Sequence, residues 1–203
     1  MNSIIDIAFS DTVKAIQERR GPRENYAKMA ARGGWTNLLG EDVVDFVRKQ
    51  NSIYLGTTGA NGQPYIQHRG GPPGFLHVLD ERTIAFADFR GNRQFISQGN
   101  LADNSKAFLF LMDYANTTRL KIWGEARVVE DDAELVESLM PKDYRAKAEQ
   151  AIVFTVNLLD FNCRAHIPRL VSAQDAAASI AARDQEIARL EATVEALGGN
   201  NNL

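Results

Sequence analysis

The sequence predicts a mainly β protein, an antiparallel barrel of six to seven strands with helices on its N-terminal side and one C-terminal helix. In the middle of the chain, apolar residues recur at every second position, and these segments occur in pairs joined by short turns. The flanking regions have helical spacing, and no Rossmann or Walker glycine pattern is present. We therefore expect an N-terminal helical lead over residues 1–50, a barrel domain over 51–170 and a C-terminal helix over 171–203.

The N-terminal lead should contain short helices. Residues 11–20 have helical apolar spacing, Gly21 interrupts them, and Pro22 is well placed as the first residue of a second helix ending at Ala31. A third apolar stripe covers residues 41–50, after which the period changes from helical to alternating. The barrel should therefore begin directly after this stripe.

Seven segments with strand patterns follow, arranged as consecutive hairpins. They cover residues 52–58, 63–69, 75–79, 83–88, 106–113, 118–130 and 151–160. Asn61-Gly62 separates the first two and predicts a tight turn, because both residues accept positive φ. Between the hairpins, residues 92–101 have the pattern of a short helix, and Asp131-Asp132-Ala133-Glu134 resembles a capping box that opens another.

From Val171 the composition shifts to alanine, glutamate, arginine and glutamine. Apolar residues at heptad-like spacing are Ile180, Ile187, Leu190, Val194 and Leu197. Arg183 occupies a position on the same stripe, and the repeat spans only about three heptads. This pattern favours a helix that packs at a dimer interface over a long free coiled coil, and the end from Gly198 to Leu203 should fray.

Composition excludes several classes of function. A net charge of −3 over 203 residues gives no sign of a nucleic-acid or acidic-membrane surface. One cysteine, Cys163, excludes a disulfide within the chain, and the histidines His68, His77 and His166 lack the spacing of metal ligands. With no apolar run of about 18 residues and no leader pattern, we expect a cytoplasmic protein without a metal, a membrane or a nucleic-acid partner.

Polar chemistry collects at the ends of two predicted strands. Gln67-His68-Arg69-Gly70-Gly71-Pro72-Pro73-Gly74-Phe75 is followed one hairpin later by Ala87-Asp88-Phe89-Arg90-Gly91-Asn92-Arg93-Gln94. Arginine, glycine and amide groups at two strand ends form a concave surface rich in hydrogen-bond donors, which suits a phosphate. Two simpler interpretations are open: the arginines are solvated charges at the barrel end, and the glycines and prolines form a wide turn.

With Gly99-Asn100-Leu101-Ala102-Asp103-Asn104 and Asn162-Cys163-Arg164-Ala165-His166-Ile167-Pro168, these segments resemble the pyridoxamine 5′-phosphate oxidase-like family of FMN-binding split barrels. The resemblance covers roughly residues 9–170. It implies a homodimer with two FMN molecules at the subunit interface, each held by residues of both chains.

The resemblance also implies a set of cofactor-binding residues. They are Gln67, His68, Arg69, Gly70, Gly71, Asp88, Arg90, Gly91, Asn92, Arg93, Gln94, His166, Ile167 and Arg169. Arg69 and Arg93 are the leading phosphate ligands, Gln67 and His68 would face the ring system or the ribityl chain, and the last three residues would reach the flavin of the partner subunit. The neighbouring glycines would allow close backbone approach.

Departures from the family pattern bear on the substrate. Gly74 stands where the founding oxidases carry a lysine, and the segment after His166 lacks their substrate-binding arginine and histidine pair. We therefore expect an FMN-dependent oxidoreductase acting on a small organic substrate, with NADH or NADPH as electron donor and no assigned catalytic residue. His68, His166 and Arg169 are candidates for orienting the substrate. Alternatives are a non-catalytic flavin or haem binding protein, a deazaflavin-dependent reductase, and an assembly module that works through its terminal helix.

Overall fold

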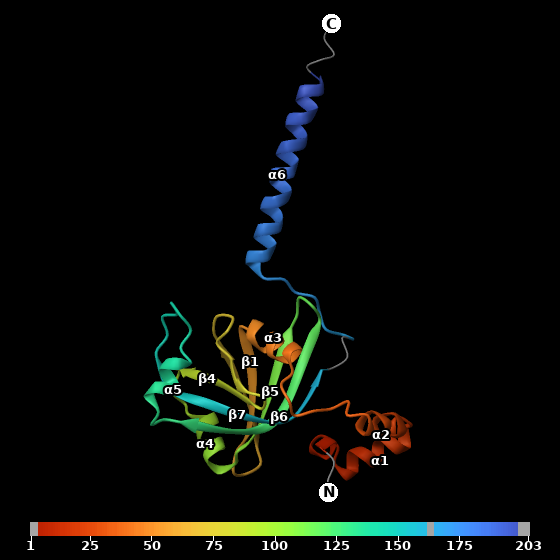
Figure 1. Cartoon of the computed structure of the whole chain (residues 1–203), viewed down its shortest axis with the longest axis vertical. Helices are drawn as coiled ribbons and strands as arrows, with labels where there is room; N and C mark the ends of the chain where they lie inside the picture. Colours follow the sequence, from red (N-terminus) through yellow and green to blue (C-terminus); the bar gives the residue numbers. More distant parts are fainter. Residues whose placement is uncertain (1–3, 162–164, 199–203) are drawn as a thin grey trace.

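The computed structural model describes residues 4–161 and 165–198. Its helices are η1 (Ile4–Ile7), α1 (Asp11–Arg20), α2 (Arg23–Ala31), α3 (Glu41–Lys49), α4 (Ile96–Asp103), α5 (Ala133–Ser138) and α6 (Ala173–Gly198). Its strands are β1 (Ser52–Thr58), β2 (Pro64–Gly70), β3 (His77–Asp80), β4 (Thr83–Phe89), β5 (Lys106–Asp113), β6 (Thr118–Val129) and β7 (Ala148–Phe161). The described chain is thus mainly β, with helices before and after the sheet (Figure 1).

All seven strands join one antiparallel sheet in the order β2-β1-β5-β6-β7-β4-β3. The three hairpins that the sequence predicts are present as β1–β2, β3–β4 and β5–β6. Their order in the sheet is not the order of the chain, because β3–β4 pairs with β7 and not with the preceding hairpin. The edge strands of the sheet are therefore β2 and β3.

The sheet encloses one main hydrophobic core. Five strands contribute to it, with Ile53 and Leu55 from β1, Ile84 and Phe86 from β4, Leu109 and Leu111 from β5, Leu120 and Ile122 from β6, and Ile152 and Phe154 from β7. Val43 and Val47 of α3 and Phe75 of the β2–β3 loop fill the same core. Side chains from strands at both sides of the sheet share this core, so the sheet curls into a barrel.

Two elements begin two or more residues later than predicted, because glycine and left-handed residues bend the backbone there, whereas β7 begins at Ala148, three residues before its predicted start. The helix predicted from residue 92 begins at Ile96, since Arg93 and Phe95 take left-handed φ values of 58° and 54°. The strand predicted from residue 75 begins at His77, since Gly74 has φ of 90° and Phe75 turns into the core.

The turn between β1 and β2 forms as predicted, except for the backbone conformation of Asn61. Gly62 takes a positive φ of 80°, whereas Asn61 is not among the residues with positive φ. The amide of Gly62 donates to the carbonyl of Gly59 at 2.8 Å, and the amide of Gly59 donates to the carbonyl of Gln63 at 3.0 Å. Asn61 contributes through its side chain, because its Oδ1 accepts from the amide of Gln63 at 3.0 Å. The expected tight β-turn therefore forms over residues 59–62, and of Asn61 and Gly62 only the glycine takes a positive φ.

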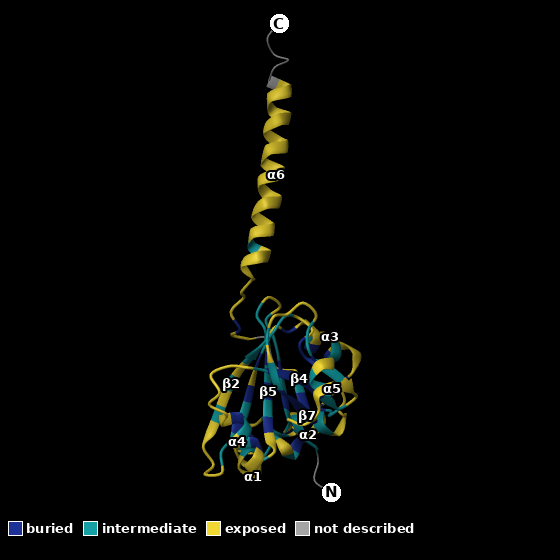
Figure 2. Cartoon of the chain, turned by 90° about the vertical axis from the view of Figure 1, so that its left-hand side faces the viewer, coloured by how far each residue is buried: buried dark blue, intermediate teal, exposed yellow. Residues whose placement is uncertain are grey.

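The helix α6 projects from the barrel into solvent (Figures 1 and 2). Of its residues 173–197, Ala176 is half-buried and all others are exposed. The part of the predicted fraying end from residue 199 onward lies outside the described residues. None of the helices described is both long enough and apolar enough to cross a membrane.

Candidate phosphate-binding site

The ends of β2 and β4 meet through an ion pair between Arg69 and Asp88. These strands are not neighbours in the sheet, so the pair joins its two sides. Both side chains are largely buried, with 17% of Arg69 and 11% of Asp88 exposed. Asp88 Oδ2 accepts a second hydrogen bond from Gln150 Nε2 at 2.9 Å, whereas the buried Nε of Arg69 has no partner among the described residues. The guanidinium therefore retains an unused donor.

A pocket lies beside this ion pair. Its lining residues are Gln67, Arg69, Asp88, Phe89, Gly91, Asn92, Arg93, Gln94, Phe95, Ser97, Gln98, Glu149 and Gln150. Its volume is about 40 Å³, which is room for a few water molecules or a phosphate-sized group. Seven residues of the predicted cofactor set line it, from Gln67 on β2 to Gln94 in the loop before α4.

Strand alternation separates two of the predicted residues. In the β1–β2 register, Arg69 lies opposite Ile53, on the face that carries the core, whereas His68 lies opposite Tyr54. The rings of His68 and Tyr54 are in contact, with centroids 5.8 Å apart. Gln67 and His68 therefore face opposite sides of the strand, and of the two only Gln67 lines the pocket.

The glycines near the pocket have different roles. A Cβ on Gly71 would lie 2.7 Å from Cβ of Phe75, so that position is closed by core packing. A Cβ on Gly70 would lie 3.0 Å from the ring of His68. A Cβ on Gly91 would meet nothing within 4 Å, so its backbone is open to an incoming group.

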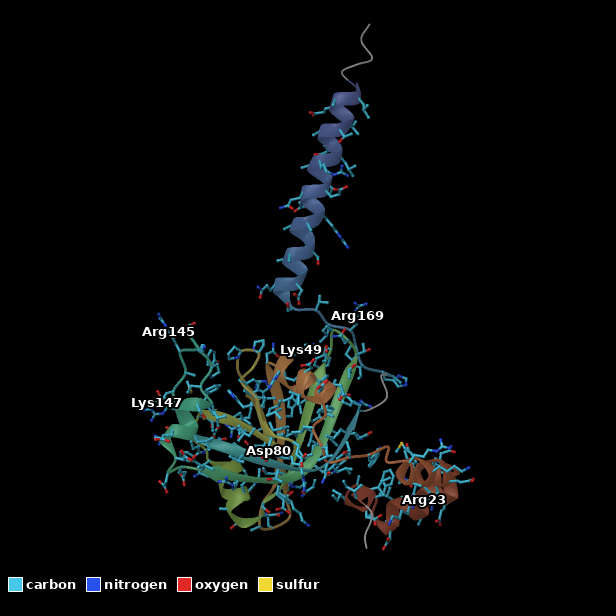
Figure 3. The ribbon with its side chains drawn as sticks, in the orientation of Figure 1. Arg23, Lys49, Asp80, Arg145, Lys147 and Arg169 are labelled. Atoms are coloured by element: carbon cyan, nitrogen blue, oxygen red, sulfur yellow. The ribbon has the colours of Figure 1, made fainter. Side chains whose placement is uncertain are left out.

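The rim of the pocket carries excess positive charge. Arg90 Nε and Arg93 Nε lie 3.0 and 3.5 Å from the same oxygen, Glu149 Oε1. One carboxylate cannot neutralise two guanidinium groups, and both arginines are about half exposed. The amide of Arg90 donates to the carbonyl of Lys147 at 2.8 Å, which holds the loop between α5 and β7 beside the rim. Figure 3 shows Arg145 and Lys147 projecting outward from this loop, which adds to the positive field.

The N-terminus of α4 completes the pocket. No side chain of the described residues caps this end, and Ser97 and Gln98 of the first turn line the cavity. Ser97 Oγ donates to Gln67 Oε1 at 2.9 Å, which connects α4 to β2. Uncapped amides at a helix N-terminus favour an anion, because their partial positive charge adds to that of nearby arginines.

The predicted C-terminal part of the site lies elsewhere in the same chain. Arg169 lies beside the start of α6, at the other end of the barrel from α4 (Figures 1 and 3). The amide of Leu170 donates to the carbonyl of Tyr114 at 3.2 Å, so this segment follows the β5–β6 turn. His166 is exposed and Ile167 is buried. Neither they nor Arg169 line the pocket, and the motif residues Asn162, Cys163 and Arg164 lie outside the described residues.

A concave apolar surface covers the outer face of β1, β2 and β5. Its lining residues are Tyr54, Gly56, Ile66, Phe108, Phe110 and Tyr114, around an open volume of about 470 Å³. Ile66 is 68% exposed. An exposed patch of large apolar side chains is typical of an interaction surface.

Several lining residues had no local signal in the sequence. Ser97, Gln98, Glu149 and Gln150 come from α4 and β7. Gln150 reaches the pocket because it pairs with Asp88 in the β4–β7 register, across 62 residues of chain. Among the described residues, no group of three or more histidine, cysteine or acidic side chains could hold a metal ion.

Comparison with known proteins gives a family match. A family model described as pyridoxamine 5′-phosphate oxidase matches residues 39–163, which is more than half of the chain. A search of the curated proteins gives no match.

Several solved structures align with the chain. A tagged, singly substituted HupZ of Group A Streptococcus aligns with a TM-score of 0.50 at 17% identity, over 62% of this chain and 100% of its own. A Lactobacillus delbrueckii protein proposed to be a pyridoxamine 5′-phosphate oxidase aligns with a TM-score of 0.48 at 25% identity, over 62% and 95%. An FMN-binding protein of Syntrophomonas wolfei aligns with a TM-score of 0.46 at 12% identity, over 72% and 97%. At 17% identity, the HupZ similarity shows a shared fold and nothing finer.

Proposed function

The chain belongs to the pyridoxamine 5′-phosphate oxidase family, and from this premise we propose that it is an FMN-dependent oxidoreductase that holds its flavin at the interface of a homodimer. The observation that carries the proposal is the pocket between β2, β4 and α4, where donors from three separate elements converge. This arrangement suits the phosphate of FMN.

Size and charge both support a phosphate in this pocket. Arg93 is half exposed and shares its carboxylate with Arg90, so a dianionic group would find an arginine whose charge is incompletely neutralised. The open backbone at Gly91 and the uncapped start of α4 add amide donors. Arg69, which is held by its ion pair with Asp88, would contribute positive charge and its unused Nε donor at the pocket wall.

A volume of about 40 Å³ admits the phosphate but not the ring system, so most of the flavin would lie outside this pocket. The apolar surface around Tyr54, Ile66 and Phe110 would provide the contact for the second subunit. Because His166, Ile167 and Arg169 do not line their own chain's pocket, any role of theirs in flavin binding would be toward the partner subunit. These three observations together favour a homodimeric site.

A bound FMN would supply the two-electron redox chemistry. The residues of this chain would bind and orient. Gln150 and Asp88 hold Arg69 in place, and Ser97 fixes Gln67 at the pocket wall. The described sheet is antiparallel throughout, so NADH or NADPH would bind transiently without a dinucleotide fold. His68, His166 and Arg169 remain candidates for orienting the substrate.

The test is the absorption spectrum of the purified protein, with mass analysis of the released ligand. Flavin bands and the mass of FMN are expected. Consumption of NADH or NADPH with a quinone or nitro acceptor should exceed the rate with an equal amount of free FMN. A Soret band, the mass of a deazaflavin, or failure to bind added FMN would overturn the cofactor assignment. Bound FMN without turnover above the free-FMN rate would reduce the proposal to a flavin carrier.

A further inference from the structure

No described residue of its own chain buries the apolar stripe of α6. Its members Ile180, Ile187, Leu190, Val194 and Leu197 are between 49% and 68% exposed. None of them belongs to a core cluster of the described residues. The helix has 26 residues and is about 39 Å long, and in proteins most of a helix's stability comes from packing of its apolar face.

We propose that α6 forms a parallel, in-register, two-stranded coiled coil with α6 of a second copy of this chain. In a heptad frame, the a positions are Ala173, Ile180, Ile187 and Val194, and the d positions are Ala176, Arg183, Leu190 and Leu197. From Ile180 onward every a residue is β-branched, and the last two d residues are leucine. This division between a and d is the one that favours two parallel strands.

The charged residues beside the stripe are compatible with this register. Arg183 interrupts the d positions, and Asp184 follows it at e. In a parallel pair without stagger, each Arg183 packs next to Asp184 of the partner subunit, so its charge is compensated. Glu186 at g faces Glu191 of the partner subunit, but Glu186 already accepts from Arg189 Nη2 and Nε at 2.6 and 2.8 Å. The like charges are thereby partly neutralised.

The position of α6 also favours a second copy as the occupant. The segment that leads into α6 is hydrogen-bonded to Tyr114, which borders the apolar surface on β1, β2 and β5. Leu170 and Val171, both exposed, continue the apolar character from this surface toward the helix. Two chains that meet through the surface would start their α6 helices close together, and this raises the effective concentration of one helix for the other. A parallel pair requires the two-fold axis to run along α6, with both barrels at the same end.

The test uses disulfide trapping in the full-length chain with Cys163→Ser as background. Ile180→Cys and Leu197→Cys are made separately near opposite ends of the stripe, and Ala192→Cys, at position f on the outer side of the helix, is the matched control. A disulfide needs Cα atoms within about 7 Å. We expect mild oxidation to convert each of the two stripe variants into a covalent dimer with itself, while the control stays monomeric on a denaturing gel.

Other packing partners of the apolar stripe would give different crosslinks. An antiparallel pair would crosslink Ile180→Cys only to Leu197→Cys in a mixture, and packing of α6 on a barrel or on another protein would crosslink neither variant with itself. Either result would overturn the proposal.

A second substitution separates this inference from the proposed function. Leu190→Glu in each stripe variant should remove the crosslink, whereas Ala192→Glu should retain it. Bound flavin is read from the same samples by absorbance. Loss of flavin with intact crosslinks would contradict only the flavin proposal, and intact flavin without crosslinks would contradict only the coiled coil.

Discussion

At the residue scale, the two pocket arginines differ in how completely their charge is used. Arg69 is largely buried and paired with Asp88, so its main role is to join β2 to β4. Arg93 is half exposed, shares Glu149 with Arg90 and lies 5.4 Å from the ring centroid of Phe95. Arg93 and Phe95 both have left-handed backbone, a strained conformation for residues other than glycine. Arg93 is therefore the better candidate for the group that binds an incoming phosphate.

We predict that Arg93→Ala weakens FMN binding about 10-fold or more, since a hydrogen bond to a charged group contributes about 1.5–3 kcal/mol. Flavin fluorescence quenching on titration measures the affinity. Arg20→Ala, at the end of α1, is the control and should leave the affinity unchanged. Equal affinities of the two variants would remove Arg93 from the site.

A second prediction at this scale concerns His77. Burial holds the pKa of His77 below its usual 6.5, although the carbonyl of Leu139 acts in the opposite direction, and Arg48 lowers the pKa further. The unfolded chain then binds a proton more readily than the folded chain. Stability is complete above pH 6.5 and is lost as the pH falls through 6.5 toward the folded-state pKa.

The melting temperature should therefore fall between pH 7.5 and pH 5.5 more steeply in the native chain than in His77→Gln. Thermal unfolding followed by circular dichroism measures this difference. His166→Gln is the control, because His166 is exposed. If the melting temperatures of the native chain and His77→Gln change with pH in the same way, a lowered pKa of His77 in the folded chain is contradicted.

At the scale of elements, the loops after β2 and β4 are shaped by different demands. The loop after β2 contributes to the core, because Gly71 leaves room for Phe75 to pack closely. The amide of Gly71 also donates to the carbonyl of Asn51 at 3.0 Å. The loop after β4 serves the pocket, because Gly91 lies open and Arg93 and Phe95 take left-handed conformations before α4. Two glycine-containing loops that look alike in sequence therefore have different roles.

Alanine substitutions should distinguish the two loops. Gly71→Ala should destabilise the fold by about 1–3 kcal/mol, because the new methyl group overlaps Phe75. Gly91→Ala should leave stability nearly unchanged and weaken FMN binding, because its methyl group occupies the space open to a ligand. Urea unfolding and FMN titration measure the two effects. A stable Gly71→Ala variant, or a Gly91→Ala variant with native affinity, would contradict this division of roles.

At the scale of the whole molecule, two of the exposed apolar surfaces formed by the described residues concern association. One is the concave surface on β1, β2 and β5, and the other is the stripe along α6. They are connected through the segment held at Tyr114. Exposed apolar patches are typical of interaction surfaces, and we propose that the barrel surface contributes to the flavin-binding dimer interface while α6 contributes to association alone.

Ile66→Glu should weaken FMN binding and, in a Leu190→Glu background, shift the sedimenting species from dimer to monomer. The charge would lie in the centre of the proposed barrel interface, where burial is costly. Leu79→Glu is the matched control, since Leu79 is also an exposed aliphatic residue on an edge strand. If the variant that combines Ile66→Glu and Leu190→Glu still sediments as a dimer, the barrel interface lies elsewhere.

The sequence by itself determined the fold class, the hairpins, the first helices and the stripe of α6, because these features depend on period and turn residues within short windows. It also indicated the arginines and glycines at the ends of β2 and β4. The sequence did not determine which of these residues lie together in one pocket. His68 faces away from Gln67, Gly71 accommodates Phe75, and Arg169 lies at the other end of the barrel.

Only the tertiary structure decided how the pocket is composed. The pairing of β4 with β7 brings in Glu149 and Gln150, and the curl of the sheet sets Arg69 against Asp88. Strand order and curl arise from packing of one shared core across distant segments, and no local pattern records that packing. For this reason the arginine, glycine and amide residues of the two strand ends could be named from the sequence, whereas the contributions of β7 and α4 to the pocket could not.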